Sequence, residues 1–301
     1  MDHQRTAQPP TGEEEQAKEI EKEDAAEPEA QAEEEDRMWG IPLSDLDPVR
    51  VYYEQNKLQG FTDPKDLVYP HSATLNDKVY LWRGDITNLS VDCIVNAANK
   101  SLLGGGGVDG AIHAAAGRGL YTECKTLNGA ETGETKLTGG HELPAKHVAH
   151  TVGPIYSQKR KAESEDKLRS CYKGTLELCV KNGIRTVAFS GISTGVYGYP
   201  LDDAASVACD EVRKFLEGPD GDKLDAIIFT VFRPIDVASY ENNLPAYFPP
   251  PSSNAASDAA TEGKAAESET TPEPSVEAQE AQAACQDKPP KASVEEGEKK
   301  E

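Results

Sequence analysis

The chain has 301 residues, 37% of them hydrophobic, and a formal net charge of −22. This length accommodates one well-buried domain, or two. No apolar run approaches the roughly 18 residues that cross a membrane, and the acidic N-terminus resembles neither a signal nor a transit peptide. We therefore expect a cytoplasmic or nuclear protein, and one without nonspecific nucleic-acid binding, because that activity needs clustered Lys and Arg.

Most of the negative charge lies at the two ends of the chain. Residues 1–37 carry a net charge of about −10 and residues 251–301 about −7. Both segments are rich in Glu, Ala, Pro and Ser and almost free of aromatics, so we expect disordered acidic tails that solvate the protein or contact basic proteins. Between them we expect a lead-in at residues 38–78, which packs on a single domain at residues 79–250.

From Val79 onward the pattern alternates between strands and helices. Short apolar runs predict strands, and longer amphipathic stretches predict helices. The expected strands are residues 79–82, 92–96, 147–152, 186–190 and 225–232, and the expected helices begin at Val108, Glu163, Leu201 and about Ile235. This order predicts an α/β fold, with a mixed or parallel sheet covered by helices on both faces. In such sheets, ligands bind where loops leave the carboxyl ends of strands.

The cysteines and histidines do not form a metal-binding pattern. The cysteines lack CxxC spacing, which predicts reduced and buried thiols; they are Cys93, Cys124, Cys171, Cys179, Cys209 and Cys285. Residues 141–147 begin with His-Glu, but their spacing departs from HExxH and Pro144 would break the helix that this motif needs. His147 and His150 face opposite sides of a strand, so we expect no bound metal.

The four glycines at residues 104–107 are the most informative motif. A backbone without Cβ atoms can curl around a ligand and point its N–H groups inward, which suits a phosphate. The helix that begins at Val108 adds the positive end of its dipole at the same place. Ser193, Thr194 and Gly195 follow another strand and predict a second cradle of this kind. Two cradles indicate a diphosphate.

Two competing motifs share these glycines. Residues 105–110 fit the dinucleotide pattern GxGxxG, but residues 99–103 separate them from the strand, whereas a Rossmann turn leaves its strand directly. Residues 191–195 fit the hydrolase pattern GxSxG, yet that architecture places its histidine after the serine, and the last histidine here is His150. Both alternatives are therefore disfavoured.

Polar residues beside the glycines suggest two further roles. Asp85 ends the first strong strand, where it either caps a turn or accepts a hydrogen bond from an exocyclic amine such as that of adenine. His113 lies one helical turn after Asp109 and hence on the same face. Next to the glycine run, this pair is a candidate for acid–base chemistry.

Several blocks of the sequence, taken in order, resemble macrodomains of the MacroD type. The blocks are residues 84–87, 96–107, 108–113, 146–154 and 191–200, and the resemblance spans residues 79–248. It implies a three-layer αβα sandwich with a central mixed sheet that binds ADP-ribose. It also implies hydrolysis of mono-ADP-ribose from acidic residues of proteins, and of acetyl from O-acetyl-ADP-ribose, by an activated water.

The resemblance also assigns roles to individual residues. Asp85 would hold the adenine amine with the Ile86 backbone beside it, and Phe232 would lie against the adenine. Asn99 would hold the distal ribose, Tyr197 would cover it, and Asp109 would orient or deprotonate the water with support from His113. The two phosphate loops would be Gly105, Gly106, Gly107 and Val108, and Ser193, Thr194, Gly195 and Val196.

Some alternatives remain open at this point. A macrodomain that only reads ADP-ribose needs Asp85 and both loops, but not the set of Asn99, Asp109 and His113. The substrate diphosphate could share the role of base with Asp109. We expect no cofactor, and as partners ADP-ribose, O-acetyl-ADP-ribose and modified proteins, bound by a monomer that uses neither a membrane nor a specific nucleic acid.

Overall fold

The structure is a computed structural model that describes residues 40–61 and 63–251. The tails expected at residues 1–37 and 251–301 lie outside this range, apart from residue 251. Within the described part of the chain, no helix has the length and apolar character required to span a bilayer.

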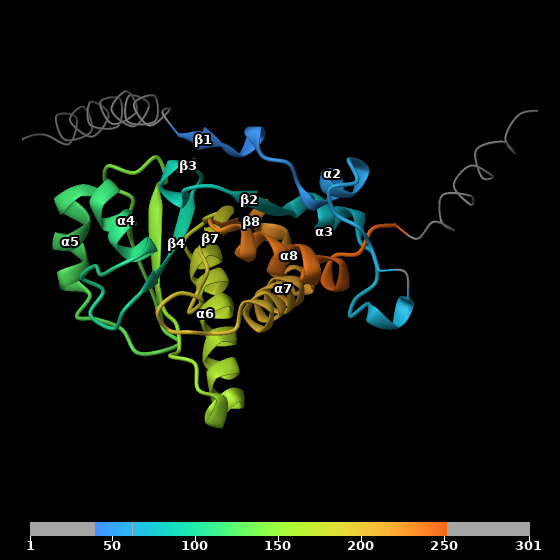
Figure 1. The fold of residues 1–301 in the computed structure, drawn as a ribbon. Coiled ribbons are helices and arrows are strands. Elements are labelled where there is room, and N and C mark those ends of the chain that lie inside the picture. Colours follow the sequence, from blue (N-terminus) through green and yellow to red (C-terminus); the bar gives the residue numbers. More distant parts are fainter. Residues whose placement is uncertain (1–39, 62, 252–301) are drawn as a thin grey trace, which may run out of the picture. The chain divides into compact units, whose positions relative to one another are not determined.

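A six-stranded sheet forms the centre of the described domain (Figure 1). Its strands, in chain order, are β2 (Val79–Arg83), β4 (Cys93–Ala98), β5 (Thr135–Gly139), β6 (His147–Val152), β7 (Thr186–Phe189) and β8 (Ala226–Val231). In space they run β2-β8-β7-β4-β6-β5, and every neighbouring pair is parallel except β5 with β6. The five parallel strands therefore share one carboxyl edge, where a ligand site is expected.

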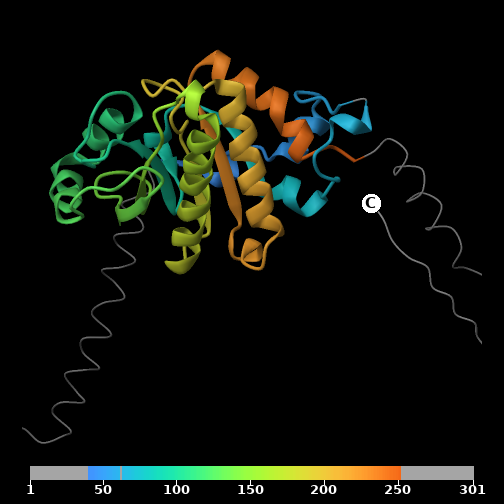
Figure 2. The same ribbon diagram turned by 90° about the horizontal axis from the view of Figure 1, so that it is seen from below.

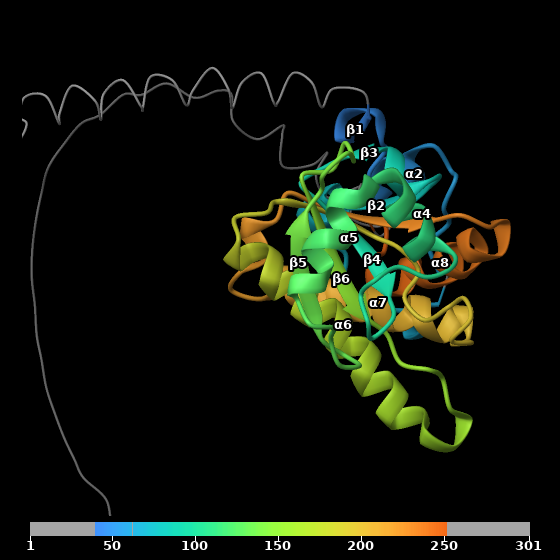
Figure 3. The ribbon, with the colours of Figure 1, turned by 90° about the vertical axis from the view of Figure 1, so that its left-hand side faces the viewer.

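Helices cover both faces of this sheet, as the sequence predicts. They are α4 (Val108–Ala115), α5 (Gly117–Thr126), α6 (Lys161–Lys181), α7 (Leu201–Glu217) and α8 (Pro234–Tyr247). Figure 2 shows α6 and α7 side by side on one face, and Figure 3 looks onto α4 and α5, which lie in front of β4, β5 and β6. The result is a three-layer αβα sandwich.

The alternation of side chains along each strand explains this two-sided packing. Cys93 and Val95 of β4 join the core beneath α6, α7 and α8, whereas Ile94 between them joins the core beneath α4 and α5. Phe189 and Ala188 of β7 divide in the same way. Because both faces are buried, these strands read as nearly continuous apolar runs, which is why they could be recognised in the sequence.

The segment before the sheet consists of short elements that contact it. They are β1 (Ile41–Pro42), α2 (Val49–Glu54) and α3 (Ala73–Lys78), with the 3₁₀ turns η1 (Leu43–Asp45) and η2 (Pro64–Asp66). Strand β1 pairs with β3 (Leu89–Ser90), which follows β2. Three further 3₁₀ turns lie later in the chain: η3 (Ile86–Asn88), η4 (Gln158–Arg160) and η5 (Gly221–Lys223). Tyr52 donates its hydroxyl to the carbonyl of Leu81 at 2.7 Å, and Tyr53 donates to the carbonyl of Phe248 at 2.9 Å. These bonds connect α2 to the sheet and to the end of α8.

Among the six strands of the sheet and the five helices that cover it, two elements were not predicted from the sequence. The edge strand β5 contains Thr, Lys and Gly, is only half buried, and so lacks the apolar signal of the central strands. Helix α5 starts at Gly117, whose φ is +73°, immediately after α4, and the glycines Gly117 and Gly119 mask its helical pattern. The other expected elements occur within two residues of their predicted ends.

Arg213 connects three parts of the domain from a fully buried position on α7. Its side chain is 1% exposed and donates to the carbonyls of Tyr247 and Pro70 at 2.8 and 2.9 Å, and to Glu217 at 2.8 Å. The guanidinium also lies over the ring of Tyr69, 5.0 Å from its centroid. One side chain thus joins α7, α8 and the segment before the sheet.

Replacing Arg213 with Met should lower the free energy of unfolding by about 2 to 4 kcal/mol, because two buried carbonyls lose their donor. Urea unfolding measures this loss. Arg185→Met is the control, because its ion pair with Asp225 lies at the surface and should contribute far less. Equal midpoints for the two variants would contradict the structural role of Arg213.

Candidate functional site

A cavity of about 440 Å³ lies at the carboxyl edge of the sheet. Of the residues expected at the site, it is lined by Asp85, Ile86, Gly107, Val108, Thr194, Gly195 and Phe232. These residues come from the loops after β2, β4, β7 and β8, so the parallel strands bring together segments nearly 150 residues apart. The lining does not include Asn99, Asp109 or His113, which lie beyond the glycine loop.

The glycine loop after β4 is open toward solvent and tightly packed against α4. A Cβ atom on Gly106 or Gly107 would meet nothing within 4 Å, so this backbone leaves free space in front of it. Gly107 caps α4 with φ +63° and ψ −138°, a conformation that side chains disfavour. At Gly110 a Cβ would lie 2.6 Å from the carbonyl oxygen of Gly105, so only glycine lets the loop fold onto the helix.

The loop after β7 forms the facing wall. Ser193 is buried with φ +64°, and its hydroxyl has no hydrogen-bond partner among the described residues. Ser193 therefore has no histidine base, which agrees with the rejection of a GxSxG hydrolase. Gly195 faces open space, whereas Val196 is 98% exposed. The loop therefore leaves its backbone uncovered at Gly195, whereas the Ser193 hydroxyl is buried and packs against Gly153.

Asp85 caps a turn, which is one of the two roles left open by the sequence. Its Oδ1 accepts from the backbone N–H and the hydroxyl of Thr87, at 3.0 and 2.8 Å, and thereby caps η3. The residue is nevertheless exposed and lines the cavity, with Oδ2 making no hydrogen bond within the described chain. Gly84 beside it packs on the indole of Trp82, where a Cβ would lie 2.2 Å from the ring.

Asp109 is buried in the first turn of α4, and amide groups hold its carboxylate. Asn96 Nδ2 donates to Asp109 Oδ1 at 2.7 Å, and Asn99 Nδ2 lies 3.4 Å from Asp109 Oδ2. Asn99 Nδ2 also donates to the carbonyl of Gly104 at 2.8 Å, and its Oδ1 accepts from Ser101. The structure thus brings Asn99 and Asp109 side by side, next to the glycine run.

Burial raises the pKa of the Asp109 carboxyl above its ordinary value, because removal from water disfavours the charged form. The hydrogen bond from Asn96 and the nearby His113 act in the opposite direction but do not cancel it. A carboxylate with a raised pKa is a stronger base than an exposed one. Asp109 therefore has the electrostatics of a general base.

His113 lies on the same face of α4 as Asp109, as the helical spacing predicts. Its Nε2 is 3.5 Å from Asp109 Oδ1, yet it makes no hydrogen bond to any described residue. The imidazole packs against Gly104, where a Cβ would lie 3.4 Å from the ring. His113 thus supports the glycine loop and leaves one nitrogen unsatisfied.

Two expected aromatic residues differ in their relation to the cavity. Phe232 is 71% exposed and lines the cavity, next to Asp236, which pairs with Arg233 at 2.6 Å. Tyr197 is half buried, and its carbonyl accepts from the backbone N–H of Tyr156 at 2.9 Å. Tyr197 is not one of the residues that line the cavity.

Several residues that form the site were not predicted from the sequence. Tyr172 of α6 and Tyr240 of α8 line the inner part of the cavity, together with Ala204 and Ala205 of α7. The two alanines near the start of α7 could have indicated a cavity, because small side chains leave room for a ligand. Asn96 was also missed, although a polar residue inside an apolar strand is itself a signal for a buried hydrogen bond.

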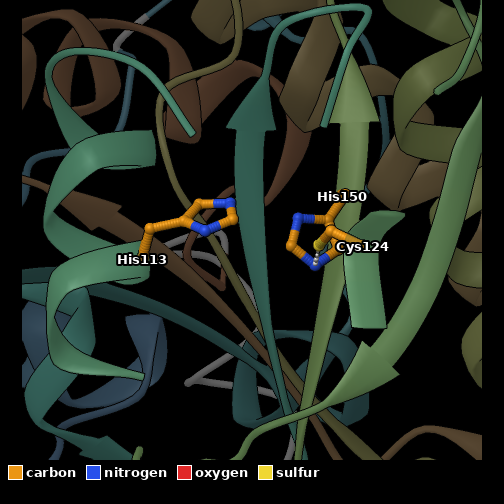
Figure 4. Close-up of side chains that lie close together, drawn as sticks. All are labelled: His113, Cys124 and His150. Atoms are coloured by element: carbon orange, nitrogen blue, oxygen red, sulfur yellow. Dashed lines mark hydrogen bonds between the residues drawn. The ribbon is translucent and has the colours of Figure 1, made fainter. Parts of the chain in front are cut away.

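Two imidazole groups and one thiol lie close together behind the site (Figure 4). The ligand atoms of His113, Cys124 and His150 lie within 4.8 Å of one another. However, His150 Nε2 is already hydrogen-bonded to the hydroxyl of Thr138 at 2.9 Å, so a metal would have to displace this bond. The five described cysteines are buried free thiols, as expected, and Cys285 lies outside the described residues.

The two histidines of the rejected HExxH pattern have hydrogen-bond partners outside this cluster. His141 Nε2 pairs with Glu123 at 2.6 Å, and His147 Nδ1 lies 3.1 Å from the carbonyl of Asp92. They therefore do not share a ligand.

Comparison with known proteins identifies the family. The profile described as Macro domain matches residues 95–208. The rat protein named ADP-ribose glycohydrolase MACROD1 is 53% identical over 181 residues, which cover 60% of this chain and 70% of that protein. The Xenopus laevis protein named ADP-ribose glycohydrolase MACROD2 is 48% identical over 207 residues, which cover 68% of this chain but only 49% of that protein.

Solved structures agree with this match. The Trypanosoma brucei macrodomain in complex with ADP-ribose is 44% identical, with a TM-score of 0.56 over 68% of this chain and 76% of that one. The macro domain of ganglioside induced differentiation associated protein 2 is 33% identical, with a TM-score of 0.63 over 70% of this chain and 98% of that one. The chain therefore belongs to the macrodomain family, and within that family it is of the MacroD type.

Proposed function

We propose that the chain is an ADP-ribose glycohydrolase that removes mono-ADP-ribose from acidic residues of proteins and also deacetylates O-acetyl-ADP-ribose. The observation that carries this proposal is the position of Asp109, a buried carboxylate of raised pKa, directly behind an open glycine loop. The names of the rat and frog relatives support the reaction, and the ADP-ribose complex of the trypanosomal macrodomain supports the ligand.

ADP-ribose fits the chemistry of the cavity and the two loops. The adenine would lie between Phe232 and the Asp85–Ile86 segment, with the free Oδ2 of Asp85 accepting from its exocyclic amine. The diphosphate would bind the backbone N–H groups of residues 105–108 and 193–196, aided by the N-terminus of α4. The distal ribose would then extend past Gly105 toward Asn99 and Asp109, with Tyr197 above it.

Hydrolysis needs a water molecule held beside the ester at the distal ribose. Asp109 would take a proton from this water while the oxygen of the water attacks either ribose C1 or the acyl carbonyl. The ester bond then breaks, and the products are ADP-ribose and the free carboxylic acid. A positioned general base contributes about 10² to 10⁴ in rate. A reader of ADP-ribose needs the cavity alone, whereas a buried Asp109 held by two amides serves a reaction.

Replacing Asp109 with Asn should lower kcat about 10² to 10⁴-fold while ADP-ribose still binds, because the base is lost but the shape is kept. The measurement is release of ADP-ribose from a protein labelled on glutamate, with affinity followed by calorimetry. Unchanged turnover would remove Asp109 from the reaction, and a wild-type protein that binds without turnover would favour the reader.

Replacing Asp85 with Asn should weaken ADP-ribose binding by about 1 to 3 kcal/mol, because an amide N–H₂ would then face the adenine amine. Asparagine retains the side-chain oxygen that caps η3, so the fold should be preserved. Calorimetry of the two proteins with ADP-ribose measures the difference. Equal affinities would show that Asp85 does not contact the adenine.

The pH dependence should separate Asp109 from the substrate diphosphate as the main base. Because burial raises the pKa of Asp109 above the ordinary aspartate value, kcat/KM should fall as the pH decreases through that raised pKa. A diphosphate ionises at lower pH and would give no such decline. A pH–rate profile without this acidic limb would assign the base role to the substrate.

A further inference from the structure

Behind Asp109, four polar groups form a hydrogen-bond relay across the sheet. They are the side chains of Asn96, His150 and Thr138 and the carbonyl of Val148. Asn96 Nδ2 donates to Asp109 Oδ1 and also lies 3.1 Å from His150 Nδ1. His150 Nε2 lies 2.9 Å from the hydroxyl of Thr138, which donates to the carbonyl of Val148 at 3.4 Å. Asn96, His150 and Thr138 are fully or almost fully buried, so no water competes for these bonds.

The sheet register holds this chain of bonds in place. Asn96 of β4 lies directly opposite His150 of β6, and Thr138 of β5 lies opposite Val148 of the same strand. Side chains at paired positions of neighbouring strands lie on one face and within reach of each other. The relay therefore depends on backbone pairing and not on mobile loops.

The proton positions in this chain follow from the ionised carboxylate. Asp109 can only accept, so Asn96 must turn its amide nitrogen toward it; the reverse orientation would bring two oxygens to 2.7 Å. The second hydrogen of the same nitrogen then faces His150 Nδ1, which must accept it. His150 consequently carries its proton on Nε2, where the oxygen of Thr138 accepts it.

The surroundings keep His150 neutral. Burial, together with the nearby His113, lowers the pKa of His150 to about 3. The titratable groups around Asp109 are His113 on the same helix, His150 on β6 and Cys124 on α5, and burial raises the pKa of the Cys124 thiol to about 11. Neither His150 nor Cys124 therefore changes charge near neutral pH.

We propose that His150 is a positioning residue, which fixes the amide of Asn96 and through it the orientation of the Asp109 carboxylate. This inference rests on the proposed hydrolase function. His150 does not touch the reacting atoms; it supplies the acceptor that prevents the Asn96 amide from rotating. Without that acceptor, Asn96 would donate less effectively to Asp109, and the Asp109 carboxylate would lose its orientation toward the water. A metal bound by His113, Cys124 and His150 is the competing interpretation, and it would require the opposite tautomer of His150.

An isosteric pair of substitutions tests the acceptor. In His150→Asn, the side-chain oxygen occupies the position of Nδ1, whereas His150→Leu has the same shape and no acceptor. We expect His150→Leu to lower kcat about 10- to 100-fold with KM within about twofold of wild type, the scale of a misplaced catalytic group. His150→Asn should regain most of this loss. Equal kcat values for the two variants would overturn the proposal, since both remove the same ring.

A milder pair tests the far end of the relay. Thr138→Val removes the hydroxyl that accepts from His150 Nε2 without changing the size of the side chain, and Thr138→Ser keeps that hydroxyl. Thr138→Val should lower kcat about three- to tenfold, and Thr138→Ser should not. If His150→Leu fails to fold, this pair decides the question, and identical kcat values would overturn the proposal.

Nuclear magnetic resonance tests the relay without any turnover. The ¹⁵N shifts of the His150 ring should report a proton on Nε2 from pH 5 to 9, and the ¹³C shift of the Asp109 carboxyl should give a pKa about one unit higher in His150→Leu than in His150→Asn. A proton on Nδ1, or its appearance there when Zn²⁺ is added, would overturn the proposal. If the wild type shows no turnover but the shifts are as expected, the proposed hydrolase fails while the relay stands.

Discussion

A buried carboxylate held mainly by amide groups determines the architecture of the site. Asp109 is held at the start of α4 by the amide of Asn96, and its 3.5 Å approach to His113 makes no hydrogen bond. Such a group is costly to bury unless donors surround it. The central strand must therefore carry a polar residue in an otherwise apolar run, and the strand beside it must carry the acceptor that orients that residue.

The parallel sheet provides the rest of the geometry. Four loops leave the same edge, so residues separated by almost 150 positions line one cavity. The glycine loops add no side chains and leave their backbone uncovered, whereas Asp85 and Phe232 confer chemical character at one end. Under the proposed function, the loops bind the ligand and the start of α4 supplies the base. Arg213 stabilises the opposite end of the domain and has no part in either.

Local patterns predicted most of the fold and part of the site. The central strands and the long helices were recognisable because burial on both faces gives apolar runs, and the loop at residues 104–107 was recognisable because its glycines are consecutive. The edge strand β5 was not, because it is half exposed. Tyr172, Tyr240 and Asn96 were missed for another reason: their roles depend on which strands and helices become neighbours, and a single sequence does not state that pairing.

The raised pKa of Asp109 also has a consequence for the stability of the whole protein. Most of the perturbed carboxyls shift the other way. Hydrogen bonds and cations lower the pKa of Asp92, Asp210 and Asp236 although these groups are buried or partly buried, and the hydrogen bond from Arg185 lowers the pKa of the exposed Asp225. Those groups stabilise the native state above the ordinary carboxyl range, and that contribution is lost as the pH falls. Asp109 does the opposite, since the folded protein binds its proton more tightly than the unfolded chain, and its ionisation opposes folding as the pH rises through the raised value. The carboxylate that takes the proton from water in the proposed reaction is therefore a group whose ionised form the fold disfavours.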